Sequence, residues 1–153
     1  DSIDGRLAIA TDSLFRGYIT DNGFQVVNLK NGFFLTSDLV TINNELSLVI
    51  DGRFDFQFNS GGSLVSPEFI ESLLESFEFV DRCIILPQSD KKFGYVPIAI
   101  IKTSYAINDL IELCSKHLPI HMRPKDFLPW PINIDLFNKQ ARSQLMMYFK
   151  DSI

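Results

Sequence analysis

Three short segments carry residue types that could bind or activate a ligand containing phosphate. Asp38 follows an apolar run, and its two carboxylate oxygens could accept hydrogen bonds from the vicinal hydroxyls of a ribose. Arg53 could donate to a ribose or a phosphate through its planar fork. Gly61 and Gly62 have no Cβ, so the backbone there could approach a thin ligand closely. Lys139 has a flexible stem that could bring its amine to the charge developing on a phosphate.

Each segment also has a simpler structural interpretation, which the sequence leaves open. Asp38, taken alone, is more typical of a residue that caps a turn. The stretch from Arg53 to Gly62 is equally compatible with a hairpin turn beside a solvated arginine. A lone Lys139 near a chain end is typically a solvated surface residue. His117 and His121 have no patterned acidic or cysteine partner, so we assign them to surface or helix-end positions.

Composition indicates a folded globular chain and argues against several classes of protein. The 153 residues are 46% hydrophobic and 22% charged, close to the globular average. No apolar stretch approaches the roughly 18 residues of a membrane-spanning helix, and a net charge of −5 disfavours a general nucleic-acid binder. Cys83 and Cys114 lie in apolar segments without metal-ligand spacing, which disfavours a zinc site or disulfide scaffold and favours a reducing cytoplasm.

The elements that must position these residues change character near residue 53. The first part is rich in short apolar or alternating runs separated by turn residues, which predicts strands at 6–11, 25–29 and 46–50. The second part mixes helical and strand patterns, and so we predict an α+β fold with a central sheet flanked by helices. Its predicted elements are a helix from Pro67 to Phe77, a strand at 80–86 closed by Pro87, a polar loop at 88–92, a strand at 96–101, a helix at 107–118, a strand at 126–130 and a helix at 140–149.

Taken in order, these segments resemble the C-terminal part of the adenylate-forming enzymes, which include acyl- and aryl-CoA synthetases, luciferases and the adenylation domains of peptide synthetases. That family has a Thr-Gly-Asp, a Gly-Arg, a hinge acid or lysine, a Gly-Gly, a Pro-x-Glu-Ile-Glu helix and a final Lys ahead of an Arg. The matching residues are Thr36-Ser37-Asp38, Gly52-Arg53, Asp55, Gly61-Gly62, Pro67-Glu68-Phe69-Ile70-Glu71 and Lys139-Gln140-Ala141-Arg142. Six motifs in this order, over essentially the whole chain, make the resemblance specific.

Some positions depart from the family pattern, and others narrow the resemblance to one branch. Ser37 and Asn138 stand where the family commonly has glycine. The stretches 56–62 and 85–97 are most similar to the o-succinylbenzoate–CoA ligases of menaquinone synthesis. The short ending after Arg142 is similar to that branch as well.

The resemblance implies a domain organisation and a reaction. Residues 1–53 would be the β-rich end of a large adenylation domain, and 54–153 a small mobile C-terminal α+β domain with its hinge near Asp55. The enzyme would be an acid–thiol ligase that adenylates a small-molecule carboxylate with ATP and Mg²⁺ and then transfers the acyl group to coenzyme A. By correspondence, Asp38 and Arg53 would hold the ribose, and Lys139 would act in adenylation. After the domain rotates, Gly61-Gly62 would face the channel for the pantetheine arm.

The resemblance also sets expectations about activity and partners. The family's phosphate loop, adenine-stacking segment, metal-binding glutamate and acyl pocket would precede this chain, and the chain lacks an initiator Met, so we expect a fragment that is inactive alone. We expect a cytoplasmic protein with no nucleic-acid partner and no membrane span, and homo-oligomerisation stays open. Two alternatives remain: a synthetase or adenylation domain for another acid, or a non-catalytic interaction module whose fourteen Phe residues supply an apolar interface.

Overall fold

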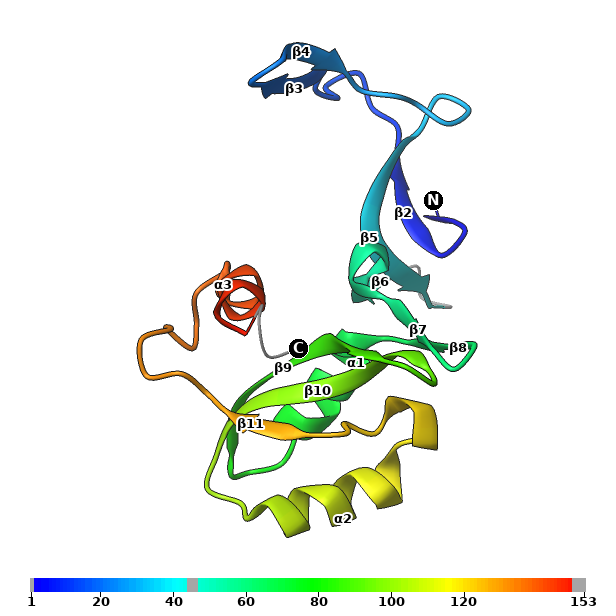
Figure 1. Cartoon of the computed structure of the whole chain (residues 1–153). Helices are drawn as coiled ribbons and strands as arrows, with labels where there is room; N and C mark the ends of the chain where they lie inside the picture. The colour runs from blue at the N-terminus through cyan, green and yellow to red at the C-terminus, as the bar shows by residue number, and fades with distance from the viewer. Residues whose placement is uncertain (1, 44–46, 150–153) are drawn as a thin grey trace. The chain divides into compact units, whose positions relative to one another are not determined.

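The chain divides into two compact units, Asp1–Asp55 and Phe56–Ile153. The computed structural model describes residues 2–43 and 47–149 (Figure 1). In its described part the N-terminal unit is built of strands, whereas the C-terminal unit combines strands with helices. The predicted α+β class is therefore confirmed. None of the helices in the described ranges is long and apolar enough to cross a membrane.

The N-terminal unit is a small antiparallel structure with little core. Its elements are β1 (Ser2–Ile3), β2 (Arg6–Ile9), β3 (Gly17–Thr20), β4 (Gly23–Val26), β5 (Phe34–Ile42) and β6 (Leu48–Arg53). The 3-10 helix η1 (Phe54–Phe56) follows and spans the boundary between the two units. Four strands form a sheet in the order β1-β2-β5-β6, and β3 pairs with β4 in a separate hairpin. Among the described residues of this unit, Ala8 and Val40 are the only hydrophobic residues that are buried.

The strands predicted for this unit are only partly correct. The strand predicted at 6–11 matches β2, and the strand predicted at 46–50 matches β6 from Leu48 onward. Leu46 lies outside the described residues. The strand predicted at 25–29 lies too far along the chain, because β4 ends at Val26. The apolar run before Asp38 predicts a strand that ends just before this residue, but β5, the longest strand of the unit, continues past it to Ile42. Asp38 therefore lies inside a strand.

The C-terminal unit is a mixed sheet covered by three helices. Its elements are β7 (Phe58–Ser60), β8 (Ser63–Val65), α1 (Pro67–Glu75), β9 (Val80–Asp90), β10 (Gly94–Thr103), α2 (Ile107–His117), the 3-10 helix η2 (Ile120–Met122), β11 (Phe127–Pro129) and α3 (Ala141–Tyr148). The sheet has the order β11-β10-β7-β8, with β9 also paired to β10. The predicted helices and the last strand are confirmed to within a few residues.

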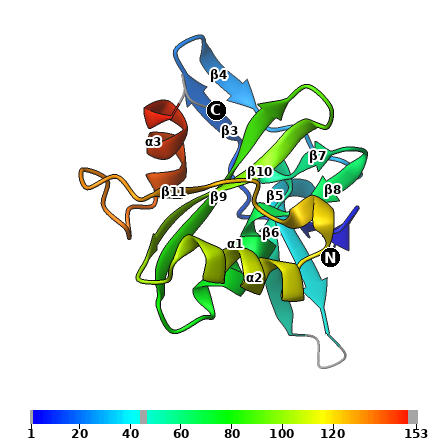
Figure 2. The same ribbon diagram turned by 60° about the horizontal axis from the view of Figure 1, so that its bottom comes forward.

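Side chains of β9 and β10 alternate between the two faces of this sheet, as extended strands require. On one face Ile85 and Ala99 pack with α1 and α2 in one core. On the other face Ile84 and Ile98 pack with α3 and Trp130 in a second core. Figure 2 shows α1 and α2 together and α3 apart from them. Burial on both faces explains why residues 96–101 are continuously apolar.

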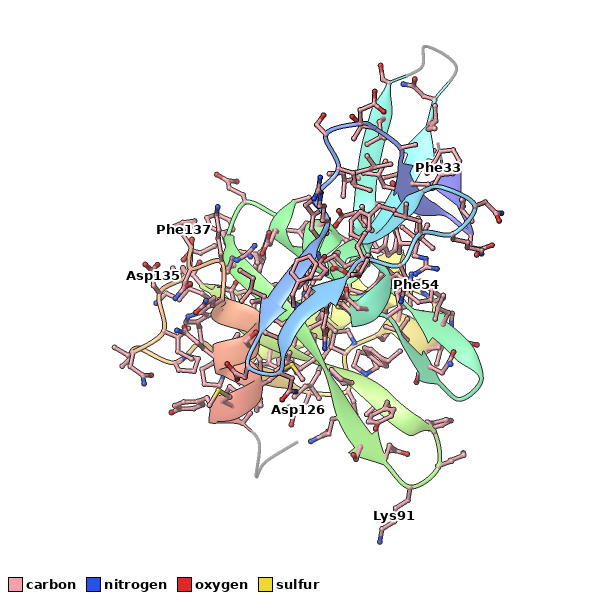
Figure 3. All side chains as sticks on the ribbon, turned by 90° about the horizontal axis from the view of Figure 1, so that it is seen from above. Phe33, Phe54, Lys91, Asp126, Asp135 and Phe137 are labelled. Carbon is pink, nitrogen blue, oxygen red and sulfur yellow. The ribbon has the colours of Figure 1, made fainter. Side chains whose placement is uncertain are left out.

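The hairpin of β9 and β10 extends further than the sequence predicts. Pro87, which we expected to close the first strand, lies directly opposite Pro97, and the strand continues to Asp90 through part of the predicted polar loop. Neither proline has an N–H to donate, so the two can face each other only at a non-hydrogen-bonded position of the ladder. The pairing therefore tolerates both prolines, and Lys91 lies at the tip of the longer hairpin (Figure 3).

Candidate functional site

Three of the predicted site residues lie together in the N-terminal unit. Asp38 of β5 is directly opposite Arg53 of β6 in the antiparallel register, and Arg53 Nη1 donates to Asp38 Oδ1 over 3.4 Å. The same guanidinium donates from Nε to Asp55 Oδ1 at 2.9 Å and from Nη2 to Asp55 Oδ2 at 2.8 Å. We call these three residues the Arg53 cluster. Arg53 bridges the carboxylates of Asp38 and Asp55, which belong to separate sequence motifs.

The Arg53 cluster is open to solvent. The side chains of Arg53, Asp38 and Asp55 are 42%, 34% and 45% exposed. Hydrogen bonds from Arg53 lower the pKa of the Asp55 carboxyl below its usual range. Because the contact to Asp38 is long and involves one carboxylate oxygen, a ligand hydroxyl can compete for that carboxylate at little energetic cost.

Gly61 and Gly62 form the tight turn between β7 and β8. Their φ angles of +58° and +85° fall in the left-handed region, as a two-residue hairpin turn requires. A Cβ added at Gly61 would lie 2.9 Å from Phe93 Cδ1, whereas one added at Gly62 would meet no atom within 4 Å. The close approach is therefore to Phe93, whose carbonyl also accepts the Gly61 N–H at 2.9 Å.

A cavity of about 470 Å³ opens beside this turn. Its lining residues are Ser60, Gly61, Ser63, Phe93, Val96, Pro97, Ile120, His121, Arg123 and Lys125. Sequence reasoning singled out Gly61 and placed His121 at a surface or helix end, but it missed both basic residues. The pair of bases that follows the Pro119 break was the only local signal for them.

Both basic residues of the cavity already hold protein partners. Arg123 donates from Nε to the carbonyl of Leu118 and from Nη2 to that of Ser115, which caps the carboxyl end of α2. Lys125 Nζ lies 2.7 Å from Asp90 Oδ2. The bond from Lys125, with two backbone N–H groups of the hairpin turn, lowers the pKa of Asp90 to about 2. The cavity thus carries cationic side chains whose positions are fixed by the fold.

Lys139 lies in the turn that leads into α3, and its side chain is exposed. Asn138, directly before Lys139, accepts the Gln140 N–H through Oδ1 at 2.8 Å and the Ala141 N–H through its carbonyl at 2.9 Å. These contacts shape the turn around Lys139. Asp135 and Phe137 lie in the loop before it, at the periphery of the unit in Figure 3.

Arg142, three residues after Lys139, anchors the first turn of α3 to the sheet. Its Nη2 donates to Glu71 Oε1 and Oε2 at 2.7 and 2.8 Å, and its Nη1 donates to the Ile85 carbonyl at 2.7 Å. Glu71 Oε1 also accepts the Ile85 N–H at 2.7 Å, and the Arg142 guanidinium lies 4.5 Å from the centre of the Phe56 ring. We call Arg142, Glu71, Phe56 and the Ile85 backbone the Arg142 cluster.

The Arg142 cluster is buried. The side chains of Arg142 and Glu71 are 14% and 10% exposed. Burial raises the pKa of the Glu71 carboxyl above its ordinary value, and the charge of Arg142 opposes that rise. Both residues belong to motifs found in the sequence, but their pairing joins positions 71 residues apart, and no local pattern reveals such a contact.

The C-terminal unit presents its two candidate regions on different sides. The Gly61 turn and the start of α3 lie well apart in both Figure 1 and Figure 2. Within the described ranges, no group of three or more His, Cys, Asp or Glu side chains could hold a metal ion. Cys83 and Cys114 are free and buried, and burial raises the pKa of Cys114 to about 11.

Comparison with known proteins points to one group of enzymes. No protein-family model matches the chain. The chain is 33% identical over 139 residues to the 2-succinylbenzoate–CoA ligase of Haemophilus influenzae, and the match covers 86% of this chain and 30% of that protein.

Two solved structures are also similar to the chain. Escherichia coli MenE with a bound m-phenylether-linked analogue of OSB-AMS is 25% identical with a TM-score of 0.73, over 95% of this chain and 35% of that one. The o-succinylbenzoate CoA synthetase of Bacillus subtilis, in complex with the acyl-adenylate intermediate OSB-AMP, is 29% identical with a TM-score of 0.65, over 76% and 25% of the two chains. This chain therefore spans between 25% and 35% of the length of these proteins.

Proposed function

In sequence and fold this chain corresponds to the C-terminal part of an adenylate-forming CoA ligase, and from that premise we propose that it belongs to an o-succinylbenzoate–CoA ligase. In the first half-reaction a carboxylate oxygen of the acid attacks the α-phosphate of ATP, giving an acyl-adenylate and pyrophosphate. In the second, the thiol of coenzyme A attacks the acyl carbon, giving a thioester and AMP. The observation that carries the proposal is similarity, over most of the chain, to ligases that share one acid substrate.

The Arg53 cluster supports a ribose-binding role for Asp38. A carboxylate can accept both hydroxyls of a ribose, and Asp38 is partly exposed with a long contact of 3.4 Å to Arg53. We propose that Asp38 binds the ribose and that Arg53 orients this carboxylate and contacts the nucleotide.

The C-terminal unit carries Lys139 on one side and the Gly61-Gly62 turn on another, which supports the use of a different side in each half-reaction. Lys139 offers an exposed cation at the start of α3, suited to the charge on an α-phosphate. The Gly61-Gly62 turn borders a cavity that could admit a thin thiol arm. We propose that residues 54–153 move as a domain against the β-rich end of the large domain, residues 1–53, and that the pivot is Asp55, where the boundary between the compact units falls.

The proposal extends to the remaining requirements of the reaction. We propose that ATP binds with Mg²⁺ through residues outside this chain, that the enzyme works in the cytoplasm, and that the 153 residues alone lack activity. Neither nucleic acid nor membrane takes part in this reaction, and a homo-oligomeric enzyme is compatible with it.

The first test changes Lys139 in the full-length protein. With o-succinylbenzoate as the acid, Lys139→Ala should slow ATP–pyrophosphate exchange by about a hundredfold, because a cation at the developing charge is lost. Thioester formation from preformed adenylate should stay within about twofold, because that step uses the other side of the unit. The matched control is Lys116→Ala, which removes an exposed lysine from α2. Both half-reactions should be unchanged in this control.

Three results would contradict the proposal. Equal loss of both half-reactions in Lys139→Ala would indicate a folding defect, and loss of neither would favour the interaction module. Pyrophosphate release with a fatty or aryl acid, but not with o-succinylbenzoate, would keep the ligase class and reject the proposed substrate.

A further inference from the structure

Glu71 is placed to control the position of Lys139 without touching it. The Lys139 turn is continuous with α3, and Arg142, in the first turn of that helix, is bound by Glu71 of α1. The backbone of this turn is hydrogen-bonded into the helix start, because the Ala141 N–H donates to the Asn138 carbonyl at 2.9 Å and the Gln144 N–H donates to the Gln140 carbonyl at 3.0 Å. Whatever fixes Arg142 therefore fixes the origin of the Lys139 side chain.

We infer that Glu71 is a positioning residue for adenylation, because it binds Arg142 in the first turn of α3 and so fixes the turn before that helix, which carries Lys139. The inference rests on the proposed function, since it assumes that Lys139 acts in the first half-reaction. It assigns to Glu71 a role that differs from ligand contact: the carboxylate touches Arg142 and the Ile85 N–H.

The geometry of the clamp restricts movement in several directions. Both Glu71 oxygens accept from one Arg142 nitrogen while a second nitrogen binds the Ile85 carbonyl of β9. The Phe56 ring lies against the guanidinium at 4.5 Å. A forked donor that is bound at two ends and packed against a ring has little freedom to reorient, and supporting residues hold an active group in place in this way.

Stability alone gives a weak reason for this pair. Removing two charges from water costs free energy, and well-packed apolar side chains of similar size often stabilise a fold as well or better. Apolar contacts of Ala141 and Leu145 hold α3 on the sheet, but such contacts alone do not fix the position of the first turn of the helix. The ion pair adds this directional constraint. The charged pair fixes its first turn against both α1 and β9.

A second glutamate on the same helix provides a matched control. Glu75, one turn after Glu71, accepts the Cys83 N–H and an Arg82 nitrogen through Oε1, each at 2.8 Å. Chemically the two sites are alike: a carboxylate of α1 bound to a backbone N–H of β9 and to an arginine. Arg82, however, belongs to β9, so Glu75 joins α1 to the sheet without reaching α3.

The test compares Glu71→Gln with Glu75→Gln in the full-length protein. Glu71→Gln should lower kcat of ATP–pyrophosphate exchange by about ten- to a hundredfold, because a misplacement of about 1 Å costs that much. Its KM for ATP and its rate of thioester formation from preformed adenylate should stay within about twofold. Glu75→Gln should leave all three quantities within about twofold. A purely structural role for Glu71 would lower both half-reactions together.

Hydrogen–deuterium exchange on the 153-residue chain supplies a readout that does not depend on catalysis. Glu71→Gln should speed exchange in residues 139–148 by about tenfold or more, and Glu75→Gln should not. Arg142→Lys, which keeps the charge but loses the fork, should reproduce the Glu71→Gln result in both assays, so the inference remains testable if one variant folds poorly.

The outcomes separate this inference from the proposed function. If Lys139→Ala abolishes pyrophosphate exchange while Glu71→Gln and Arg142→Lys do not affect it, the inference is overturned and the function stands. Equal loss of both half-reactions in Glu71→Gln and Arg142→Lys also overturns the inference. If Lys139→Ala leaves exchange unchanged, the proposed function fails and this inference fails with it.

Discussion

Arg53 and Arg142 each bind carboxylate through a forked guanidinium, but the first pairing is exposed to solvent and the second is buried. The Arg53 cluster lies in a unit with little core, and its side chains are between 34% and 45% exposed. The Arg142 cluster lies between a helix, a strand and an aromatic ring, with side chains 14% and 10% exposed. The same chemistry therefore has two different physical consequences.

The two ion pairs differ in how easily a ligand can replace one partner. An exposed ion pair is worth roughly 0–1 kcal/mol because water and salt screen it, so a ligand can replace one partner cheaply. A buried pair cannot be opened without leaving a charge in the interior. The contrast supports the proposed ligand contact at Asp38 and Arg53, and it predicts that the contact in the Arg142 cluster stays fixed.

The largest expected effect is on stability. Arg142→Ala should lower the free energy of unfolding of the chain by about 3–5 kcal/mol, because Glu71 is left charged and buried. Arg53→Ala should lower it by less than about 1 kcal/mol, because Asp38 and Asp55 can be hydrated in its place. Urea denaturation of both variants and of the wild-type chain measures the difference. Similar losses in the two variants would remove the contrast between the clusters.

A double variant sharpens this comparison. Glu71→Met with Arg142→Leu replaces the whole pair with apolar side chains and should recover most of the stability lost in Arg142→Ala. If positioning is the role of the pair, the double variant should still exchange pyrophosphate slowly in the full-length protein. Recovery of both properties would show that packing alone suffices.

The two clusters were also not equally predictable from the sequence. Asp38, Arg53 and Asp55 were selected because each belongs to a short motif, and a hairpin brings such neighbouring motifs together. Glu71 and Arg142 also belong to motifs, but they meet only after β9 and α3 pack against α1. A local pattern reports residue types and nearby spacing, and the partners across a folded sheet depend on the whole topology.

The same limit explains the strand errors. Residues 96–101 were predicted correctly because a strand buried on both faces is continuously apolar. The mixed sequence of β5, which contains Thr36, Ser37 and Asp38, gives no such signal, and its strand character comes from pairing with β2 and β6. A proline cannot donate to a ladder, so Pro87 predicts a strand end, but its partner across the ladder is a second proline and the strand continues.

A smaller effect is expected at the pivot. Asp55→Pro in the full-length protein should slow thioester formation by about tenfold, because proline fixes φ at the residue that we propose turns. Adenylation should change by less than about threefold. Asp55→Asn is the control, since it loses the carboxylate bound by Arg53 but keeps φ free, and both half-reactions should remain near wild type. Equal effects of the two substitutions would assign any defect to the ion pair and reject the pivot.

The smallest effect is a difference in pH dependence, and its sign separates the two clusters. Arg53 lowers the pKa of Asp55 below 3.8, so this carboxylate stabilises the fold above pH 3.8 and the contribution is lost as the pH falls through the lowered value. Burial raises the pKa of Glu71 above 4.5, so the folded chain binds this proton more tightly than the unfolded chain. Stability from Glu71 therefore increases as the pH falls through the raised value, and is complete below 4.5.

Urea denaturation of the 153-residue chain as a function of pH measures both signs. The unfolding free energy of wild type minus that of Asp55→Asn should decrease on acidification below pH 3.8. The corresponding difference for Glu71→Gln should increase as the pH falls from neutral toward 4.5, since glutamine does not titrate. Two differences of the same sign would mean that one carboxylate is not in the surroundings described. Because Arg142 opposes the effect of burial, Arg142→Leu should make the Glu71 difference larger, and a change in the other direction would place the dominant influence on Glu71 in the ion pair.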